Sequence, residues 1–174
     1  MVMGVSGAGK STVASLLAER IGAHFVDADD LHSPANRRKL AAGQPLTDED
    51  RGPWLAAVRD HMRDWERRDT SGPGPDRGLV VACSALRRAY RDVLREVDRP
   101  VFFVELSADP DLVAARLAAR RGHFASRQLW ESQLRTWEPL EPDEWGISRP
   151  ISLSPDQLVR EVLAALGAAC CDRT

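Results

Sequence analysis

The chain has 174 residues, of which 43% are hydrophobic and 29% are charged, and its formal net charge is −2. This size suits one globular domain, and the slightly acidic balance argues against a basic surface for nucleic acid. No apolar run approaches the ~18 residues that a membrane span needs, and no secretory leader is visible. We therefore expect one domain over residues 1–174, with neither a nucleic-acid nor a membrane partner.

The first half of the chain alternates short apolar strands with amphipathic helical patterns. Gly22 ends the first helix, and Ser33 followed by Pro34 has the form of an N-cap with proline at the first helical position. Strands are expected at 1–5 and 24–26, and helices at 11–21, at 34–43 and over a longer stretch that opens at 47–50.

A polar Gly/Pro loop at 69–78, which we expect to be exposed and mobile, precedes the second half. Strands are then expected at 79–83, 101–106 and 147–151, and helices at 85–96, 110–121, 126–138 and 155–169. Because strands and helices alternate, we expect an α/β domain with right-handed crossovers and a parallel sheet covered on both faces.

The three cysteines suggest no metal or redox chemistry. Cys83 lies in the apolar run 79–83, and Cys170 and Cys171 are adjacent, so no CxxC spacing exists. This usage is typical of structural cysteines in a reducing compartment, and we expect a cytoplasmic protein.

Residues 4–11 read GVSGAGKS and match the phosphate-binding pattern GxxxxGK[ST] between a strand and a helix. The glycines let successive backbone N–H groups face phosphate oxygens, Lys10 adds a mobile charge, and Ser11 offers a hydroxyl to Mg²⁺. This context predicts the P-loop NTPase fold with ATP and Mg²⁺. The expected ATP-binding residues here are Ser6, Gly7, Ala8, Gly9, Lys10, Ser11 and Thr12. Only three residues precede Gly4, which is short for a central strand, so its start is left open.

Two acidic residues follow the second expected strand. In an open parallel sheet, the carboxyl ends of the strands line the ligand crevice. Asp29 is the candidate to orient or deprotonate an attacking hydroxyl, and Asp27 the candidate to hold Mg²⁺ together with Ser11. The alternative is that these acids simply begin a solvated turn.

Four separated blocks are similar to the small bacterial-type gluconokinases. Residues 29–40 (DDLHSPANRRKL) and 43–55 (GQPLTDEDRGPWL) resemble the signature D-x-L-H, N-x-x-K, G-x-P-L-x-D-x-D-R, P-W-L. Residues 83–95 (CSALRRAYRDVLR) and the RGHF, SQ and TxE groups within 121–138 agree as well. The resemblance covers roughly residues 1–145. It implies ATP-dependent phosphorylation of D-gluconate on its 6-hydroxyl, a nucleoside-monophosphate-kinase-like fold with strand order 2-3-1-4-5, and a homodimer.

A gluconate site needs a cation for the carboxylate and hydrogen-bonding groups for the hydroxyls. Asn36 and Lys39 lie three apart on one helix face, and arginine binds carboxylates bidentately. Besides Asp29, the expected substrate-binding residues are His32, Asn36, Lys39, Arg51, Ser84 and His123. Simpler roles stay open: a pair with Asp48 for Arg51, solvation for Lys39, and caps for His32 and Ser84.

Residues 116–138 are the expected mobile lid. Kinases similar to this chain close an arginine-bearing lid that excludes water and places charge on the transferring phosphoryl group. Arg116 and Arg120 are four apart on one helix face, with Arg121 and His123 just beyond. We assign ATP binding to Arg116 and Arg120 and a catalytic role to Arg120, beside Lys10 and Asp29; the alternative is a solvated arginine face.

Two other functions remain open on the sequence alone. A shikimate-kinase-like enzyme would share the P-loop and the DxD, but should show a Gly-Gly pair where this chain has Cys83-Ser84. A nucleotide-binding regulator without turnover would tolerate Asp29→Asn, whereas a kinase would lose turnover and keep its ATP affinity.

Overall fold

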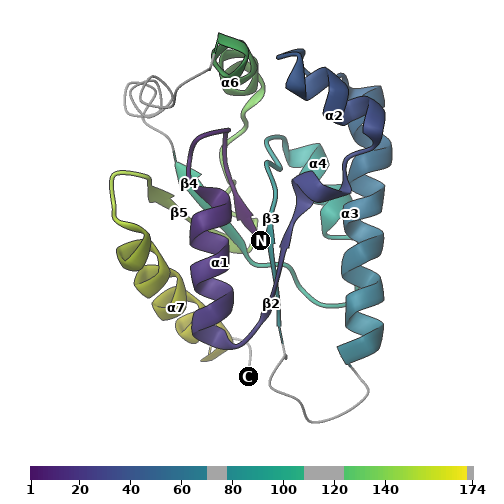
Figure 1. Cartoon of the computed structure of the whole chain (residues 1–174). Coiled ribbons are helices and arrows are strands. Elements are labelled where there is room, and N and C mark those ends of the chain that lie inside the picture. The colour runs from purple at the N-terminus through teal and green to yellow at the C-terminus, as the bar shows by residue number, and fades with distance from the viewer. Residues whose placement is uncertain (70–77, 108–123, 172–174) are drawn as a thin grey trace.

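Five parallel strands form the sheet of this computed structural model, which describes residues 1–69, 78–107 and 124–171 (Figure 1). The order is β2-β3-β1-β4-β5, as predicted. In register, Val2 lies between Ala82 of β3 and Val104 of β4. The strands are β1 (Val2–Met3), β2 (His24–Asp27), β3 (Leu79–Ala82), β4 (Phe103–Ser107) and β5 (Gly146–Pro150).

Most of the expected helices are present. They are α1 (Lys10–Ile21), the short 3₁₀ helix η1 (Ala28–Leu31), α2 (Pro34–Ala41), α3 (Asp48–Asp69), α4 (Arg88–Leu94), α6 (Phe124–Thr136) and α7 (Pro155–Cys171). The predicted loop residues 70–77 and the predicted helix 110–121 lie outside the described residues. None of the helices in the described ranges is long and apolar enough to cross a membrane.

Helices cover both faces of the sheet because the strands are apolar on both sides. Val80 and Ala82 of β3 belong to the core beneath α1 and α7, whereas Val81 and Cys83 belong to the core beneath α3 and α4. Figure 1 shows α1 and α7 side by side on one face and α3 on the other. Continuous apolar strands are what a sheet buried on both faces requires.

Local signals place several helix ends as expected. Gly22, with φ of 64°, ends α1, and its N–H bonds to the carbonyls of Ala18 and Glu19. The hydroxyl of Ser33 accepts from the N–H of Asn36 at 3.1 Å and caps α2.

The helix expected at 85–96 is shorter and begins at Arg88. Ala85 has φ of +44° and Arg87 is extended, so residues 84–87 form a loop rather than a first helical turn. Ser84 therefore does not cap α4, which corrects one of its two expected roles. The irregular loop also turns Arg87 and Arg88 toward different partners, as described below.

Candidate active site

The P-loop joins β1 to α1 at the carboxyl end of the sheet. Gly4 has φ of +143°, and a Cβ there would lie 2.9 Å from the carbonyl oxygen of Leu106, so no larger residue fits. Gly9, with φ of +95°, precedes α1 and provides no side-chain cap. The first N–H groups of α1 are thus left for an anion, as in phosphate-binding loops generally.

Lys10 lies half-buried over this loop, where its Nζ donates to the carbonyl oxygen of Val5 at 3.2 Å. Burial lowers the pKa of Lys10, while the carboxylates of Asp29 and Asp27 oppose that shift. A polyphosphate beside the ammonium would favour its charged form further. The structure therefore places the ammonium of Lys10 over the predicted phosphate-binding loop.

Asp27 connects the P-loop helix to the end of β2. Its Oδ2 accepts from the hydroxyl of Ser11 at 2.6 Å, and its Oδ1 accepts from the N–H of Asp29 at 3.1 Å. A hydroxyl and a carboxylate are oxygen ligands of the kind that Mg²⁺ takes alongside phosphate oxygens. The donor set at Ser11 and Asp27 thus fits the predicted metal site. In the described part of the chain, no group of three or more His, Cys, Asp or Glu side chains forms a separate metal site.

The carboxylate of Asp29 is open to solvent and faces His32. The side chain of Asp29 is 72% exposed, and its Oδ1 lies 3.7 Å from Nε2 of the buried His32. His32 stacks on Trp54 of α3 with ring centroids 4.3 Å apart, and Trp54 donates to the carbonyl of Ala28 at 2.7 Å. Burial lowers the pKa of His32 against the opposing charge of Asp29. Asp29, His32 and Trp54 therefore form one wall of the site, which begins at the exposed carboxylate of Asp29.

Two of the predicted residues on α2 meet the first turn of α3. Asn36 is buried, and its Nδ2 donates to the carbonyl oxygen of Asp50 at 2.9 Å. Lys39 places Nζ 2.7 Å from both carboxylate oxygens of Asp50. The two side chains therefore share a face, as predicted, and the structure replaces the alternative of a merely solvated Lys39 with an ion pair.

Asp48, Arg51, Arg87 and Tyr90 form what we call the open cluster, between α3 and α4. Arg87 Nη1 donates to Asp48 Oδ2 at 2.8 Å, the Tyr90 hydroxyl donates to Asp48 Oδ1, and Arg51 Nη1 donates to the Tyr90 oxygen at 3.4 Å. Both guanidinium carbons lie 5.6 Å from the centroid of the Tyr90 ring. Arg51 also lies 3.6 Å from Asp48, the pair that the sequence offered as the alternative to a substrate contact. Arg87 and Tyr90 were not among the predicted site residues.

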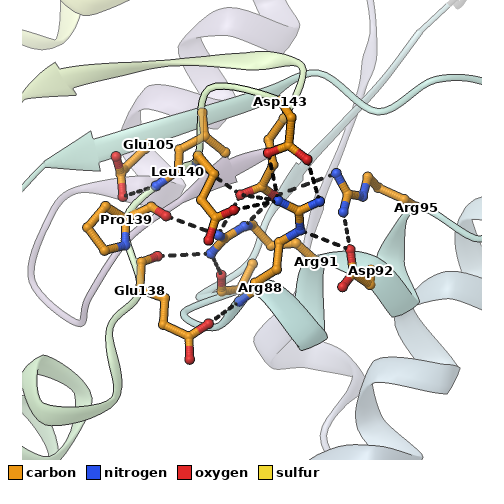
Figure 2. A network of polar contacts seen from close by, with 12 residues as sticks. Arg88, Arg91, Asp92, Arg95, Glu105, Glu138, Pro139, Leu140 and Asp143 are labelled. Atoms are coloured by element: carbon orange, nitrogen blue, oxygen red, sulfur yellow. Dashed lines mark hydrogen bonds and ion pairs between the residues drawn. The ribbon is translucent and has the colours of Figure 1, made fainter.

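On the other side of α4 lies a second group, which we call the sealed network: Arg91, Glu144 and the carbonyls of Ala85, Glu138 and Pro139 (Figure 2). The side chains of Arg91 and Glu144 are both 0% exposed, and two hydrogen bonds of 2.7 and 2.6 Å join them. Arg88 points to its rim and bonds to Asp143 and Glu141.

Sequence reasoning also missed a contact between α6 and the P-loop. The N–H of Ser6 donates to Oε1 of Gln133 at 2.6 Å, although 127 residues separate them. Gln133 was noted only as part of a matching block, and no local pattern could reveal its target. Ser84 lies beside the P-loop, where its carbonyl accepts from the N–H of Gly4 at 3.3 Å. Arg116, Arg120, Arg121 and His123 lie outside the described residues.

Comparison with known proteins places these features in context. The sequence profile of a family described as an AAA domain matches residues 1–140. A gluconokinase from Gluconobacter oxydans is 44% identical over 163 residues, which make up 94% of this chain and 88% of that protein. An unliganded sugar kinase from Janibacter sp. is 42% identical with a TM-score of 0.86, over 95% of this chain and 92% of that one. A gluconokinase structure from Sinorhizobium meliloti is 41% identical with a TM-score of 0.81, over 97% and 90% of the two chains.

Proposed function

The chain belongs to the gluconokinase family, and from that premise we propose how its residues transfer the γ-phosphoryl group of ATP to the 6-hydroxyl of D-gluconate. The products are 6-phospho-D-gluconate and ADP. The enzyme is an ATP-dependent kinase of the P-loop type, so its task is to position two substrates and to stabilise charge on the transferring group.

The P-loop binds the phosphates of ATP. The loop from Ser6 to Thr12 lies around the phosphates at the N-terminus of α1, where the first N–H groups of the helix have no side-chain cap, and Lys10 adds its ammonium to the β- and γ-phosphates. Ser11 and Asp27 would hold Mg²⁺, which neutralises charge on those phosphates when it is bound. On binding ATP, Lys10 would exchange the carbonyl of Val5 for phosphate oxygens.

Asp29 acts on the acceptor. Its exposed carboxylate stands next to Asp27 and within the field of Lys10, so it can accept a hydrogen bond from the 6-hydroxyl and orient or deprotonate it. Arg116 and Arg120 are the proposed lid residues, with Arg120 stabilising the transferring phosphoryl group. Both belong to the proposed lid over residues 116–138 of a single domain, 1–174.

The remaining wall of the site binds the sugar acid. The side chains proposed to bind its hydroxyls and carboxylate come from the end of η1, from α2 and α3, and from the 84–87 loop. They are His32, Asn36, Lys39, Arg51 and Ser84, with His123 from the segment before α6. His32 supports this role because one of its buried ring nitrogens, Nδ1, has no partner among the described residues.

The main support for this mechanism is the contact of Ser11 with Asp27, because it joins the carboxylates at the end of β2 to the first turn after the P-loop. The test is a coupled assay of ADP release with gluconate, shikimate, adenylylsulfate and nucleoside monophosphates as acceptors. We expect turnover with gluconate, and its absence in a protein that still binds ATP would overturn the proposal. The Cys83-Ser84 pair, rather than Gly-Gly, already argues against shikimate.

Asp29→Asn gives the matched control in the same assay. We expect turnover to fall by about 10²–10⁴-fold, as for loss of a general base, with ATP affinity unchanged. We also propose a homodimer in a reducing, cytoplasmic setting, which the family resemblance and the cysteine usage support. Light scattering on the purified protein would measure the mass directly, and a monomer at micromolar concentration would contradict the dimer.

A further inference from the structure

Arg51 and Arg87 of the open cluster have guanidinium N–H donors that make no hydrogen bond within the described residues. A guanidinium carries five N–H donors. Within the described residues, Arg87 donates one hydrogen bond, to Asp48, and Arg51 donates one, to Tyr90. The side chains of Arg87 and Arg51 are 33% and 12% exposed, so neither guanidinium is closed off from a ligand.

The protein nevertheless holds both guanidinium groups in place. Tyr90 is buried and lies against both, and its hydroxyl donates to the carboxylate of Asp48, which in turn accepts from Arg87. Pre-positioned donors lose little freedom when they bind a ligand. Two oriented cations with unused donors are the arrangement that a carboxylate needs, because each can bind it bidentately.

The open cluster also continues the wall that begins at Asp29. Asp29 faces His32, His32 stacks on Trp54, and Arg51 lies one helical turn before Trp54 on α3. Arg51 contacts Tyr90, and Arg87 contacts the same ring. A chain-like acceptor whose hydroxyl end meets Asp29 would therefore extend along this wall toward Arg51 and Arg87.

We propose that Arg87, together with Arg51, binds the carboxylate of the sugar acid and makes the enzyme select an acid over a neutral polyol. This inference rests on the proposed function, since it assigns the far end of the same acceptor. Arg87 is a specificity-determining residue, and Asp48 and Tyr90 are positioning residues that orient it. The competing interpretation is that Arg87 only anchors Asp48 at the start of α3.

The experiment compares Arg87→Gln with Arg88→Gln. Loss of one charge-assisted carboxylate contact should raise the KM for gluconate about 10- to 100-fold, with kcat and the KM for ATP within about threefold of the wild type. Arg88→Gln removes the same charge one residue away, on the side of the sealed network, and should leave the KM for gluconate unchanged. An unchanged KM in Arg87→Gln, or an equal rise in both variants, would overturn the proposal.

A carboxylate-free acceptor and two further variants separate binding from anchoring. With D-glucitol, which has a hydroxymethyl group in place of the carboxylate, Arg87→Gln and the wild type should behave alike. Arg87→Lys should recover part of the KM, because it keeps the charge but loses the planar fork. Asp48→Asn should raise the KM far less than Arg87→Gln. Equal effects of Asp48→Asn and Arg87→Gln would show that Arg87 only anchors Asp48.

The two proposals fail in different ways. If the wild type does not phosphorylate gluconate, the proposed function is wrong whatever Arg87 does. If the wild type turns gluconate over and Arg87→Gln keeps the wild-type KM, the family reaction stands and the assignment of Arg87 is wrong. Thermal unfolding of each variant, together with its KM for ATP, verifies that the fold and the nucleotide site are intact.

Discussion

Two arginine clusters lie on either side of α4, and they are built in opposite ways. In the sealed network, Arg91 makes five hydrogen bonds with five N–H donors, to Glu144 and to three carbonyls, and nothing of its side chain is exposed. In the open cluster, Arg87 makes one hydrogen bond within the described residues and remains one-third exposed. A saturated, buried arginine holds a fold together, whereas an oriented and unsaturated one can exchange partners with a ligand.

The sealed network joins the two sides of the site. Arg91 binds the carbonyls of Ala85, on the loop beside Ser84, and of Glu138, at the exit of α6. The N–H of Glu138 also donates to Leu86 at 2.7 Å. Because Gln133 of α6 contacts the P-loop, the 84–87 loop and the P-loop are held by one framework. Arg87 of the open cluster bonds to Asp48 and to none of these groups, so it can exchange that partner for a ligand without breaking the framework.

The largest expected effect comes from breaking the sealed network. Arg91→Leu removes the two short side-chain hydrogen bonds to the buried carboxylate of Glu144 and leaves Arg95 as its nearest cation, at 3.6 Å, so we expect the free energy of unfolding to fall by about 3–5 kcal/mol. Denaturant unfolding at pH 7 measures the loss, and Arg87→Leu in the open cluster should cost only a small fraction of it. The double variant Arg91→Leu with Glu144→Leu should be more stable than Arg91→Leu alone. Equal losses for Arg91→Leu and Arg87→Leu would contradict the contrast.

The second largest effect should come from acid, because protonation of Glu144 removes the stability that the sealed network contributes. Burial raises the pKa of Glu144, but the hydrogen bonds from Arg91 and the Glu141 backbone outweigh burial and hold the pKa below its usual 4.5. Its stabilising contribution is therefore complete above the unfolded pKa and is lost as the pH falls below about 4.5 through the lower folded value. In unfolding curves between pH 7 and 3, Glu144→Gln should be less stable at pH 7 and show a flatter acid slope.

In the open cluster, Asp48→Asn is the variant to compare with Glu144→Gln for the dependence of stability on acid pH. The hydrogen bond from Tyr90 holds the pKa of Asp48 low as well, but Asp48 is exposed and its contribution is screened by solvent. We expect its acid slope to stay close to that of the wild type. A slope that flattens as much as in Glu144→Gln would mean that the two clusters respond to protons alike.

Lys39 tests an intermediate arrangement, in which a half-exposed ammonium pairs with Asp50. Only two of the 24 basic residues are lysines, Lys10 and Lys39, and both occur in motifs of the site. Lys39→Arg would bind Asp50 through a planar fork and lose the compact, mobile charge, so we expect the KM for gluconate to rise several-fold at similar stability. An unchanged KM would assign Lys39 to the α2–α3 contact alone.

The smallest effect should come from the rim of the sealed network. Arg88 pairs with Asp143 and Glu141 at the surface, where an ion pair contributes little and is screened by salt. Arg88→Gln should barely change the midpoint of thermal unfolding, and its difference from the wild type should vanish in 1 M NaCl. A difference that persists at high salt would place Arg88 among the buried contacts.

Local patterns explain why much of this site could be predicted. Glycine, lysine and serine at fixed spacing specify the P-loop, and Ser33 followed by Pro34 specifies the start of α2, because each acts within one turn of chain. The strand order and the position of Asp27 and Asp29 follow from the alternation of strands and helices and from the family resemblance.

The parts that escaped prediction depend on long-range packing. Helix α4 begins at Arg88 rather than at the expected residue 85, because Ala85 adopts a positive φ. A hydrogen bond from Arg91 to the carbonyl of Ala85 stabilises that conformation. The later start of α4 turns Arg87 toward the open cluster and Arg88 toward the sealed network. The stack of His32 on Trp54 and the bond from Ser6 to Gln133 likewise join residues far apart in sequence.

The stack of His32 on Trp54 also gives the wall that begins at Asp29 an optical property. An indole in contact with an imidazole loses fluorescence when the imidazole takes up a proton. Because burial lowers the pKa of His32, the ring stays neutral near pH 7 and leaves the emission of Trp54 unquenched by this route. Trp54 is one of five tryptophans in the chain, so the part of the emission that it contributes reports, without any label, when His32 takes up a proton or leaves the stack.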